Sequence, residues 1–106
     1  MKITSEYVSG RLVIHLSGEL DHHSARDTMR GIESLLDEFM PRDAVLDMSG
    51  LTFMDSSGIA LMLKVEKRMR ETGGRCFVEN PSRQPMRVID ASGIDRLISV
   101  KGDKKA

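Results

Sequence analysis

The chain has 106 residues, a length typical of one domain, and 40% of them are hydrophobic, which favours a folded protein over a disordered one. Its 16 Lys and Arg residues balance 16 Asp and Glu residues, and this formal net charge of +0, with one Tyr and no Trp, argues against binding to nucleic acid or to an anionic membrane. The single Cys76 excludes an internal disulfide, and no apolar run approaches the ~18 residues of a membrane span, so we expect a cytoplasmic protein.

The N-terminal segment indicates two short strands joined by a tight turn. Residues 3–8 and 11–17 form the two runs, and apolar side chains alternate along the second, as in a strand with one buried face. Ser9-Gly10 between them is typical of a turn. We therefore expect a β-hairpin at the start of the domain.

A helix is expected from about residue 22 to residue 39. Asp21 is the expected N-cap, because its carboxylate can accept hydrogen bonds from the free N–H groups of the first turn. Pro41 is expected to end the helix. Spacings of three and four residues place an apolar stripe on one helix face, consisting of Ala25, Met29, Ile32, Leu36 and Phe39.

The middle of the chain indicates a buried strand followed by a long helix. Residues 44–48 are short, apolar and partly β-branched, and Ser49-Gly50 is expected to end this strand. A helical pattern begins within Asp55–Gly58 and runs to about Thr72, where Gly73-Gly74 ends it. Its expected core stripe consists of Met62, Val65 and Met69, with Leu61 beside them.

The C-terminal part indicates a strand, a helix and a last short strand. The strand is expected at 75–79, and the helix at 81–92 with Ser82 as its cap. Gly93 fits the left-handed residue that closes a helix. A final strand is expected at 98–100.

This order of elements predicts an α/β fold in one domain over residues 1–100. Strands that alternate with helices imply right-handed crossovers and a mostly parallel sheet. We expect a mixed sheet of four or five strands with the N-terminal hairpin, packed against three or four helices. Residues 101–106 have nothing to bury and are expected to be a disordered tail.

The segment Asp55-Ser56-Ser57-Gly58 is the candidate site. It joins a buried strand to a helix N-terminus, the end of an α/β sheet at which sites usually lie. From the spacing alone, simple capping of the helix is the favoured explanation for an Asp and two serines here. A nucleophilic Ser56 is disfavoured, because no histidine in the sequence is shown to face it and the G-x-S-x-G pattern is absent.

A second stripe on the same helix begins at Ser56. Ile59 and Leu63 follow it at offsets of three and seven residues, on a different flank from the core stripe. Such a stripe is either covered by another part of the chain or is a docking face for a partner. The sequence leaves both open.

No metal or cofactor is expected. His22 and His23 are candidate metal ligands, but adjacent residues on a helix point about 100° apart. No other His, Cys or carboxylate set stands at ligand spacing.

Three motifs in order resemble a known family, the STAS-domain anti-sigma factor antagonists. Phe53–Ile59 resembles their signature loop, and Gly18–His23 resembles their N-terminal motif, most closely that of the sporulation-type antagonists. Asp90–Ile94, with Ser92-Gly93, is similar to a third landmark. Relatives commonly carry a second glycine where this chain has Ala60.

The resemblance implies a function that spacing alone does not. It implies that Ser56 is phosphorylated by the anti-sigma factor, a serine protein kinase, and that a separate serine phosphatase reverses this. The unphosphorylated protein would bind the anti-sigma factor and release the sigma factor, without catalysis of its own and as a monomer or weak dimer. The alternative is a STAS scaffold or nucleotide-sensing module of a stress-type pathway. The expected partner-binding residues are Asp21, His22, Asp55, Ser57, Gly58, Ile59 and Leu63.

Overall fold

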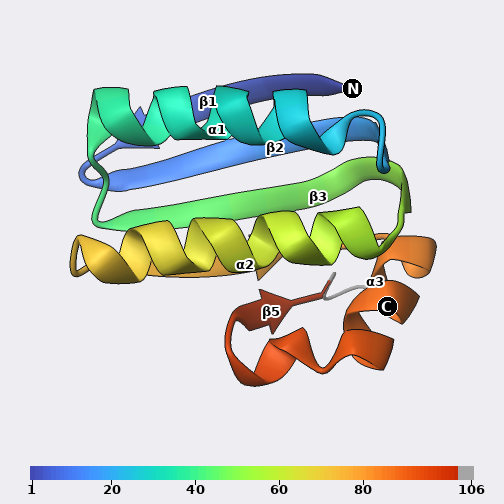
Figure 1. The fold of residues 1–106 in the computed structure, drawn as a ribbon. Helices are drawn as coiled ribbons and strands as arrows, with labels where there is room; N and C mark the ends of the chain where they lie inside the picture. Colours follow the sequence, from blue (N-terminus) through green and yellow to red (C-terminus); the bar gives the residue numbers. More distant parts are fainter. Residues whose placement is uncertain (103–106) are drawn as a thin grey trace.

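Five strands and three helices make up residues 1–102, the part of the chain that the structure, a computed structural model, describes (Figure 1). The strands lie in one sheet in the same order as in the sequence. The elements are β1 (Lys2–Val8), β2 (Arg11–Leu20), α1 (Ala25–Phe39), β3 (Asp43–Met54), α2 (Ser56–Glu71), β4 (Arg75–Glu79), α3 (Arg83–Ser92), the short 3-10 helix η1 (Ile94–Arg96) and β5 (Ser99–Lys101).

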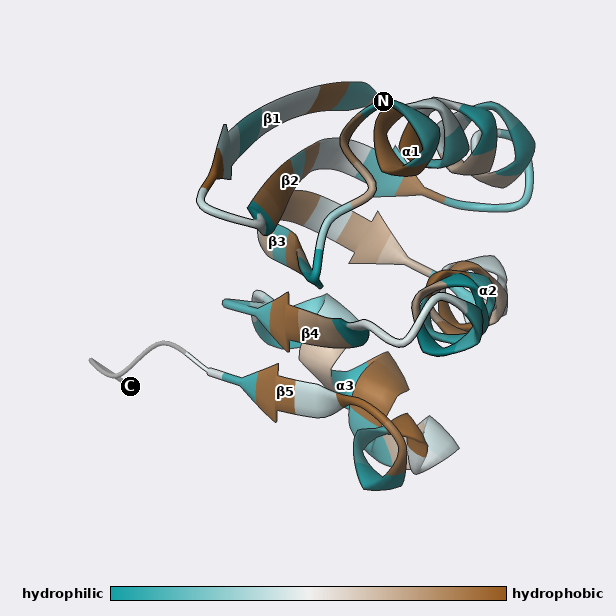
Figure 2. Ribbon diagram, turned by 90° about the vertical axis from the view of Figure 1, so that its left-hand side faces the viewer, coloured by the Kyte–Doolittle hydropathy of each residue, from teal (hydrophilic) through white to brown (hydrophobic). Residues whose placement is uncertain are grey.

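The direction of the strands decides where the helices lie. β1 and β2 pair antiparallel, whereas β2 to β5 pair parallel. Successive strands are neighbours in the sheet, and parallel crossovers are right-handed, so each helix arrives on the same face. Figure 2 shows α1, α2 and α3 together on one side of the strands. The expected fold class, a mixed and mostly parallel sheet with an N-terminal hairpin, is confirmed.

The core lies between the sheet and these helices. In β2 and β4 alternate side chains are buried, as expected of strands with one covered face, whereas the first four residues of β3 are all buried. Burial raises the pKa of the Cys76 thiol to about 12, so this thiol stays protonated and unreactive at neutral pH. The helices bury the stripes that their spacing predicts, which include Met29, Ile32 and Leu36 on α1 and Leu61, Met62, Val65 and Met69 on α2.

β2 and β3 extend further than the sequence predicts. The expected break at Ser49-Gly50 is wrong, because β3 continues to Met54 and stays paired with β2 as far as Leu20. A β-carbon on Gly50 would lie 2.7 Å from Cβ of Ser17, so glycine permits the close approach where the register shifts. Gly50 is therefore a bulge residue and not a turn residue.

The first helix begins later than predicted, at Ala25, and Ser24 rather than Asp21 is its N-cap. Asp21 instead closes the turn before the helix. Its Oδ1 accepts from the backbone N–H groups of His23 at 2.9 Å and Ser24 at 3.0 Å. The Ser24 hydroxyl accepts in return from the Asp21 N–H at 3.1 Å. This reciprocal pair resembles a capping box, which explains why the sequence suggested a cap here.

The predicted C-terminal strand, helix and short strand are all present, but some of their first and last residues differ from the prediction. α3 begins at Arg83 with Ser82 as its N-cap, and Gly93 follows it with a left-handed φ of 74°. Lys101 belongs to β5, so the expected tail is wrong at its first residue. Residues 103–106 of that tail lie outside the described residues.

The second face of the sheet has no helix from residues 1–102 over it, although parallel sheets are usually covered on both faces. Long charged side chains cover part of this face instead of a helix. Arg11 and Arg75 extend over the Phe77 ring, with guanidinium carbons 5.8 and 5.6 Å from its centroid. Val45, the partner of Phe77 in the register, is completely buried as a result.

His15 links three strands on this open face. Its Nδ1 lies 2.6 Å from Asp47 Oδ2 and its Nε2 lies 3.0 Å from Glu6 Oε2. The hydrogen bond to Asp47, assisted by Glu6, raises the pKa of His15 despite some desolvation.

We predict that His15→Gln makes stability less dependent on pH. Because the folded-state pKa of His15 is raised, its contribution is complete below the unfolded-state value of about 6.5 and is lost as the pH rises through the folded-state value. Between pH 6 and pH 9, the free energy of unfolding measured with urea should fall more for the wild type than for His15→Gln. Equal losses in the two proteins would contradict this role of His15.

Candidate functional site

The candidate site lies where β2 and β3 end together. Leu20 and Met54 are the last residues of these strands and are partners in the register. The backbone N–H of Asp55 donates to the Leu20 carbonyl at 3.3 Å, one residue beyond the strands. Because the carboxyl ends of parallel strands meet at one edge of a sheet, the motifs Gly18–His23 and Phe53–Ile59 lie side by side.

Asp55 joins the two motifs through its carboxylate. Its Oδ1 accepts from the N–H of Ser57 at 2.8 Å, which caps α2. Its Oδ2 accepts from the N–H of His22 at 3.3 Å. The capping interpretation is confirmed, and the same side chain also fixes the position of the loop before α1.

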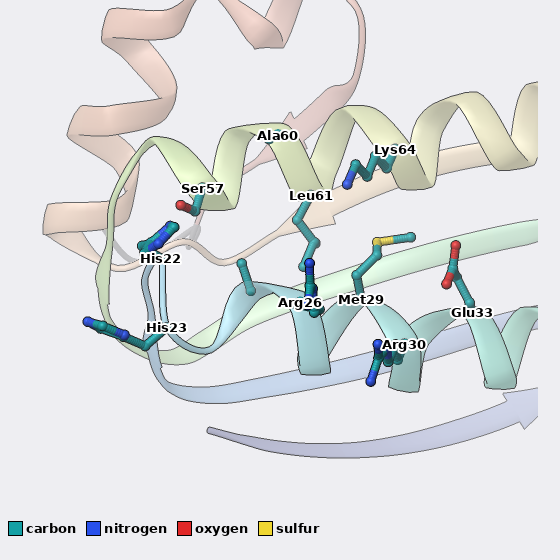
Figure 3. Close-up of a pocket in the computed structure, with 11 residues that line it drawn as sticks. His22, His23, Arg26, Met29, Arg30, Glu33, Ser57, Ala60, Leu61 and Lys64 are labelled. Carbon is teal, nitrogen blue, oxygen red and sulfur yellow. The ribbon is translucent and has the colours of Figure 1, made fainter.

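Ser56 is the first residue of α2, and it is exposed. Its hydroxyl makes no hydrogen bond to another residue within 1–102. Ser57 is half-buried and faces α1, and Figure 3 shows its hydroxyl close to the His22 ring. The two adjacent serines therefore differ in exposure, and Ser56 is the more exposed of the two.

Gly58 is buried, which is at odds with its expected place on a partner surface. A β-carbon there would lie 2.2 Å from Met54 Cγ and 3.3 Å from Leu20 Cδ2. Both of these side chains belong to the core. Gly58 thus lets the first turn of α2 pack tightly on the ends of β2 and β3.

Asp21 lies across from α2 in the neighbouring loop. The backbone N–H of Ser24, and to a lesser degree that of His23, holds the pKa of Asp21 below its usual value. Asp21 is therefore ionised at neutral pH. The loop between β2 and α1 offers a half-buried carboxylate beside the exposed His22.

The second stripe of α2 is only partly covered. Ile59 is half-buried and packs against the core, whereas Leu63 is 40% exposed. Ser56 and Leu63, the two ends of this stripe, are therefore exposed, and Ile59 between them is half-buried. An apolar side chain so exposed is available to a partner.

Gln84 of α3 also holds the site in place, and sequence reasoning missed it. Its Oε1 accepts from the Met54 N–H at 2.8 Å, and its Nε2 donates to the Met54 carbonyl at 2.9 Å. The amide side chain therefore pairs with β3 as a further strand would. Nothing in the local sequence indicates this, because the contact depends on where α3 packs.

A groove of about 910 Å³ runs between α1 and α2 and ends beside Ser57. Figure 3 shows side chains from its two walls, with Arg26, Arg30 and Glu33 on α1 and Ser57, Ala60 and Lys64 on α2. Met29 and Leu61 form its apolar floor. The remaining lining residues are His22, His23 and Ala25.

Of the three histidines, His22 and His23 lie at this site and His15 does not. His15 is paired with Asp47 and Glu6 on the open face of the sheet. Within residues 1–102 no group of three or more His, Cys, Asp or Glu side chains could hold a metal ion. In the same residues no helix is long and apolar enough to cross a membrane. The site can present a hydroxyl and a carboxylate to another protein.

Comparison with known proteins assigns the chain to a family. The STAS domain family matches residues 2–105, and the chain belongs to it. An anti-sigma F factor antagonist of Paenibacillus polymyxa is 30% identical over 100 residues, which span 94% of this chain and 86% of the relative.

Two solved structures of relatives are similar over almost the whole chain. One is the anti-sigma factor antagonist SpoIIAA in its unphosphorylated form, with a TM-score of 0.79, 28% identity and coverage of 98% of this chain and 90% of that chain. The other is the Bacillus cell fate determinant SpoIIAA in the phosphorylated form, with a TM-score of 0.71, 28% identity and coverage of 98% and 94%.

We predict that Gly58→Ala destabilises the domain. Overpacking against Met54 costs about 1–3 kcal/mol, which exceeds the gain of about 1 kcal/mol from replacing glycine by alanine inside a helix. Urea unfolding should show a lower midpoint for Gly58→Ala. Ala60→Ser, a change at an exposed position two residues further on, should leave the midpoint almost unchanged. A Gly58→Ala midpoint equal to that of the wild type would show that the contact with Met54 is not tight.

Proposed function

We propose that this protein is an anti-sigma factor antagonist whose binding is switched by phosphorylation of Ser56. In its unmodified form it binds an anti-sigma factor with serine kinase activity, and this releases a sigma factor for transcription. The kinase transfers the γ-phosphoryl group of ATP to the Ser56 hydroxyl and ends the binding. A separate serine phosphatase removes the phosphate.

The observation that carries this proposal is the exposed Ser56 hydroxyl at the point where the two family motifs meet. The relative in Paenibacillus polymyxa is named an anti-sigma F factor antagonist, and SpoIIAA has been solved with and without phosphate. These names support a sporulation-type role. The proposed partner surface consists of Asp21, His22, Asp55, Ser57, Ile59 and Leu63 around Ser56, without the buried Gly58.

The charge of a phosphate explains how the switch acts on the complex. Phosphoserine carries about −1.5 to −2 charges at neutral pH. Closing a partner over Ser56 would take this dianion out of water, and a buried charge without a partner costs several kcal/mol. Since 1.4 kcal/mol is a tenfold change in affinity, a few kcal/mol suffices to end binding.

The same charge leaves the domain folded. Ser56 is exposed, so the phosphate stays in water in the free protein. The N-terminus of α2 favours a negative charge by about 0.3–1 kcal/mol at an exposed position, and the neighbouring Asp55 opposes it. The switch therefore changes a surface and not the fold.

We predict that Ser56→Asp weakens binding to the cognate anti-sigma factor at least tenfold, whereas Ser56→Ala binds but accepts no phosphate. Calorimetric titration measures the two affinities. Mass spectrometry after incubation with the anti-sigma factor and ATP identifies the modified residue. Ser57→Ala is the matched control and should still be phosphorylated. Modification of Ser57 in the wild type, or equal affinity of Ser56→Asp and wild type, would contradict the proposal.

We also predict that Leu63→Asp weakens binding without unfolding the domain. Leu63 is 40% exposed, so its loss removes apolar contact area from the partner surface and not from the core. Circular dichroism should show an intact fold, and titration a reduced affinity. Lys67→Asp, an exposed position one turn further on, serves as the control. An unchanged affinity for Leu63→Asp would remove Leu63 from the interface.

A further inference from the structure

The groove between α1 and α2 contains an excess of positive charge. Arg26, Arg30 and Lys64 line it, all three are exposed, and none has a carboxylate within salt-bridge distance among residues 1–102. Among the described residues, 1–102, the only lining carboxylate belongs to Glu33, which lies 3.8 Å from Arg68. Because the chain as a whole has a formal net charge of +0, this excess is local.

The groove is closed at one end and open at the other. Arg68 of α2 pairs with both Glu33 and Asp37 of α1, and these ion pairs bridge the two helices at the end remote from the candidate site. At the open end lie His22 and Ser57, next to the Asp55 carboxylate that holds both of their N–H groups. Ser56 does not line the groove itself, but it directly precedes Ser57 at this end.

We infer that this basic groove binds an acidic segment of the anti-sigma factor, an inference that rests on the proposed function. The unpaired cations attract Asp or Glu side chains of the partner, and the buried Met29 and Leu61 offer an apolar floor to a residue between them. Docking there places the partner against the open end of the groove, where Ser56 is the exposed hydroxyl.

The arrangement of the cations favours a polypeptide over a small anion. Arg26 and Arg30 are one helical turn apart on α1, about 6 Å along the axis, and Lys64 stands on the opposite wall. The three cations come from two helices, and all are exposed. Carboxylates spaced along a segment match this arrangement, whereas a single phosphate would contact one or two cations.

Charge reversal in the groove tests the inference. Calorimetric titration of the cognate anti-sigma factor is carried out with wild type, Arg26→Glu, Arg30→Glu and Lys64→Glu. Each substitution should weaken binding about three- to tenfold and make the affinity less dependent on salt. The matched control is Lys67→Glu, which makes the same change of charge on α2 outside the groove and should alter the affinity less than twofold. Circular dichroism verifies the fold of each variant.

The outcomes separate this inference from the proposed function. If the groove variants bind like Lys67→Glu while Ser56→Asp still ends binding, the groove inference fails and the proposed function stands. If the wild type does not bind the anti-sigma factor, both fail. Titration with inorganic phosphate and with ADP forms a further arm. The inference would be overturned if the wild type bound either anion, the groove variants lost that binding, and their affinity for the anti-sigma factor stayed unchanged. The groove would then be a small-anion site.

Discussion

The parallel pairing of β2 and β3 to their last residues is the constraint on which the candidate site depends. Leu20 and Met54 are partners at the end of this ladder, and the ladder reaches them because Gly50 allows the bulge beside Ser17. Had β3 ended at Ser49, the segment before α2 would be a free loop. Instead the backbone N–H of Asp55 donates to the Leu20 carbonyl, and the Asp55 carboxylate accepts a hydrogen bond from the loop before α1.

The strands lie in the sheet in the same order as in the sequence, and this order has two consequences for the molecule. It gathers all three helices on one face, so the two longest, α1 and α2, lie next to each other and form the groove. It also leaves the opposite face without a helical layer. There the sheet is protected by ion pairs and by arginine side chains over Phe77, so that Val45 is still completely buried.

The site combines a rigid frame with one free group. Gly58 packs the first turn of α2 on the core, Gln84 pairs with the Met54 backbone, and Asp55 caps the helix. Within this frame the Ser56 hydroxyl remains exposed. In the proposed switch, such a frame would leave the charge of a phosphate on Ser56 to be borne by the complex, because the loop around it is fixed. The electrostatic cost then falls on partner binding.

The sequence by itself determined the class of fold, the order of the elements and the serine at the start of α2. Helix stripes, strand alternation and cap residues are local signals, and they correctly placed Ser56, Ser82 and Gly93. Only the tertiary structure decided that Gly50 continues a strand, that Gly58 is buried, and that Gln84 reaches Met54. It also decided that cations from two helices share a groove. Each of these depends on contacts between segments far apart in the chain, and the residues on either side carry no local pattern that would reveal them.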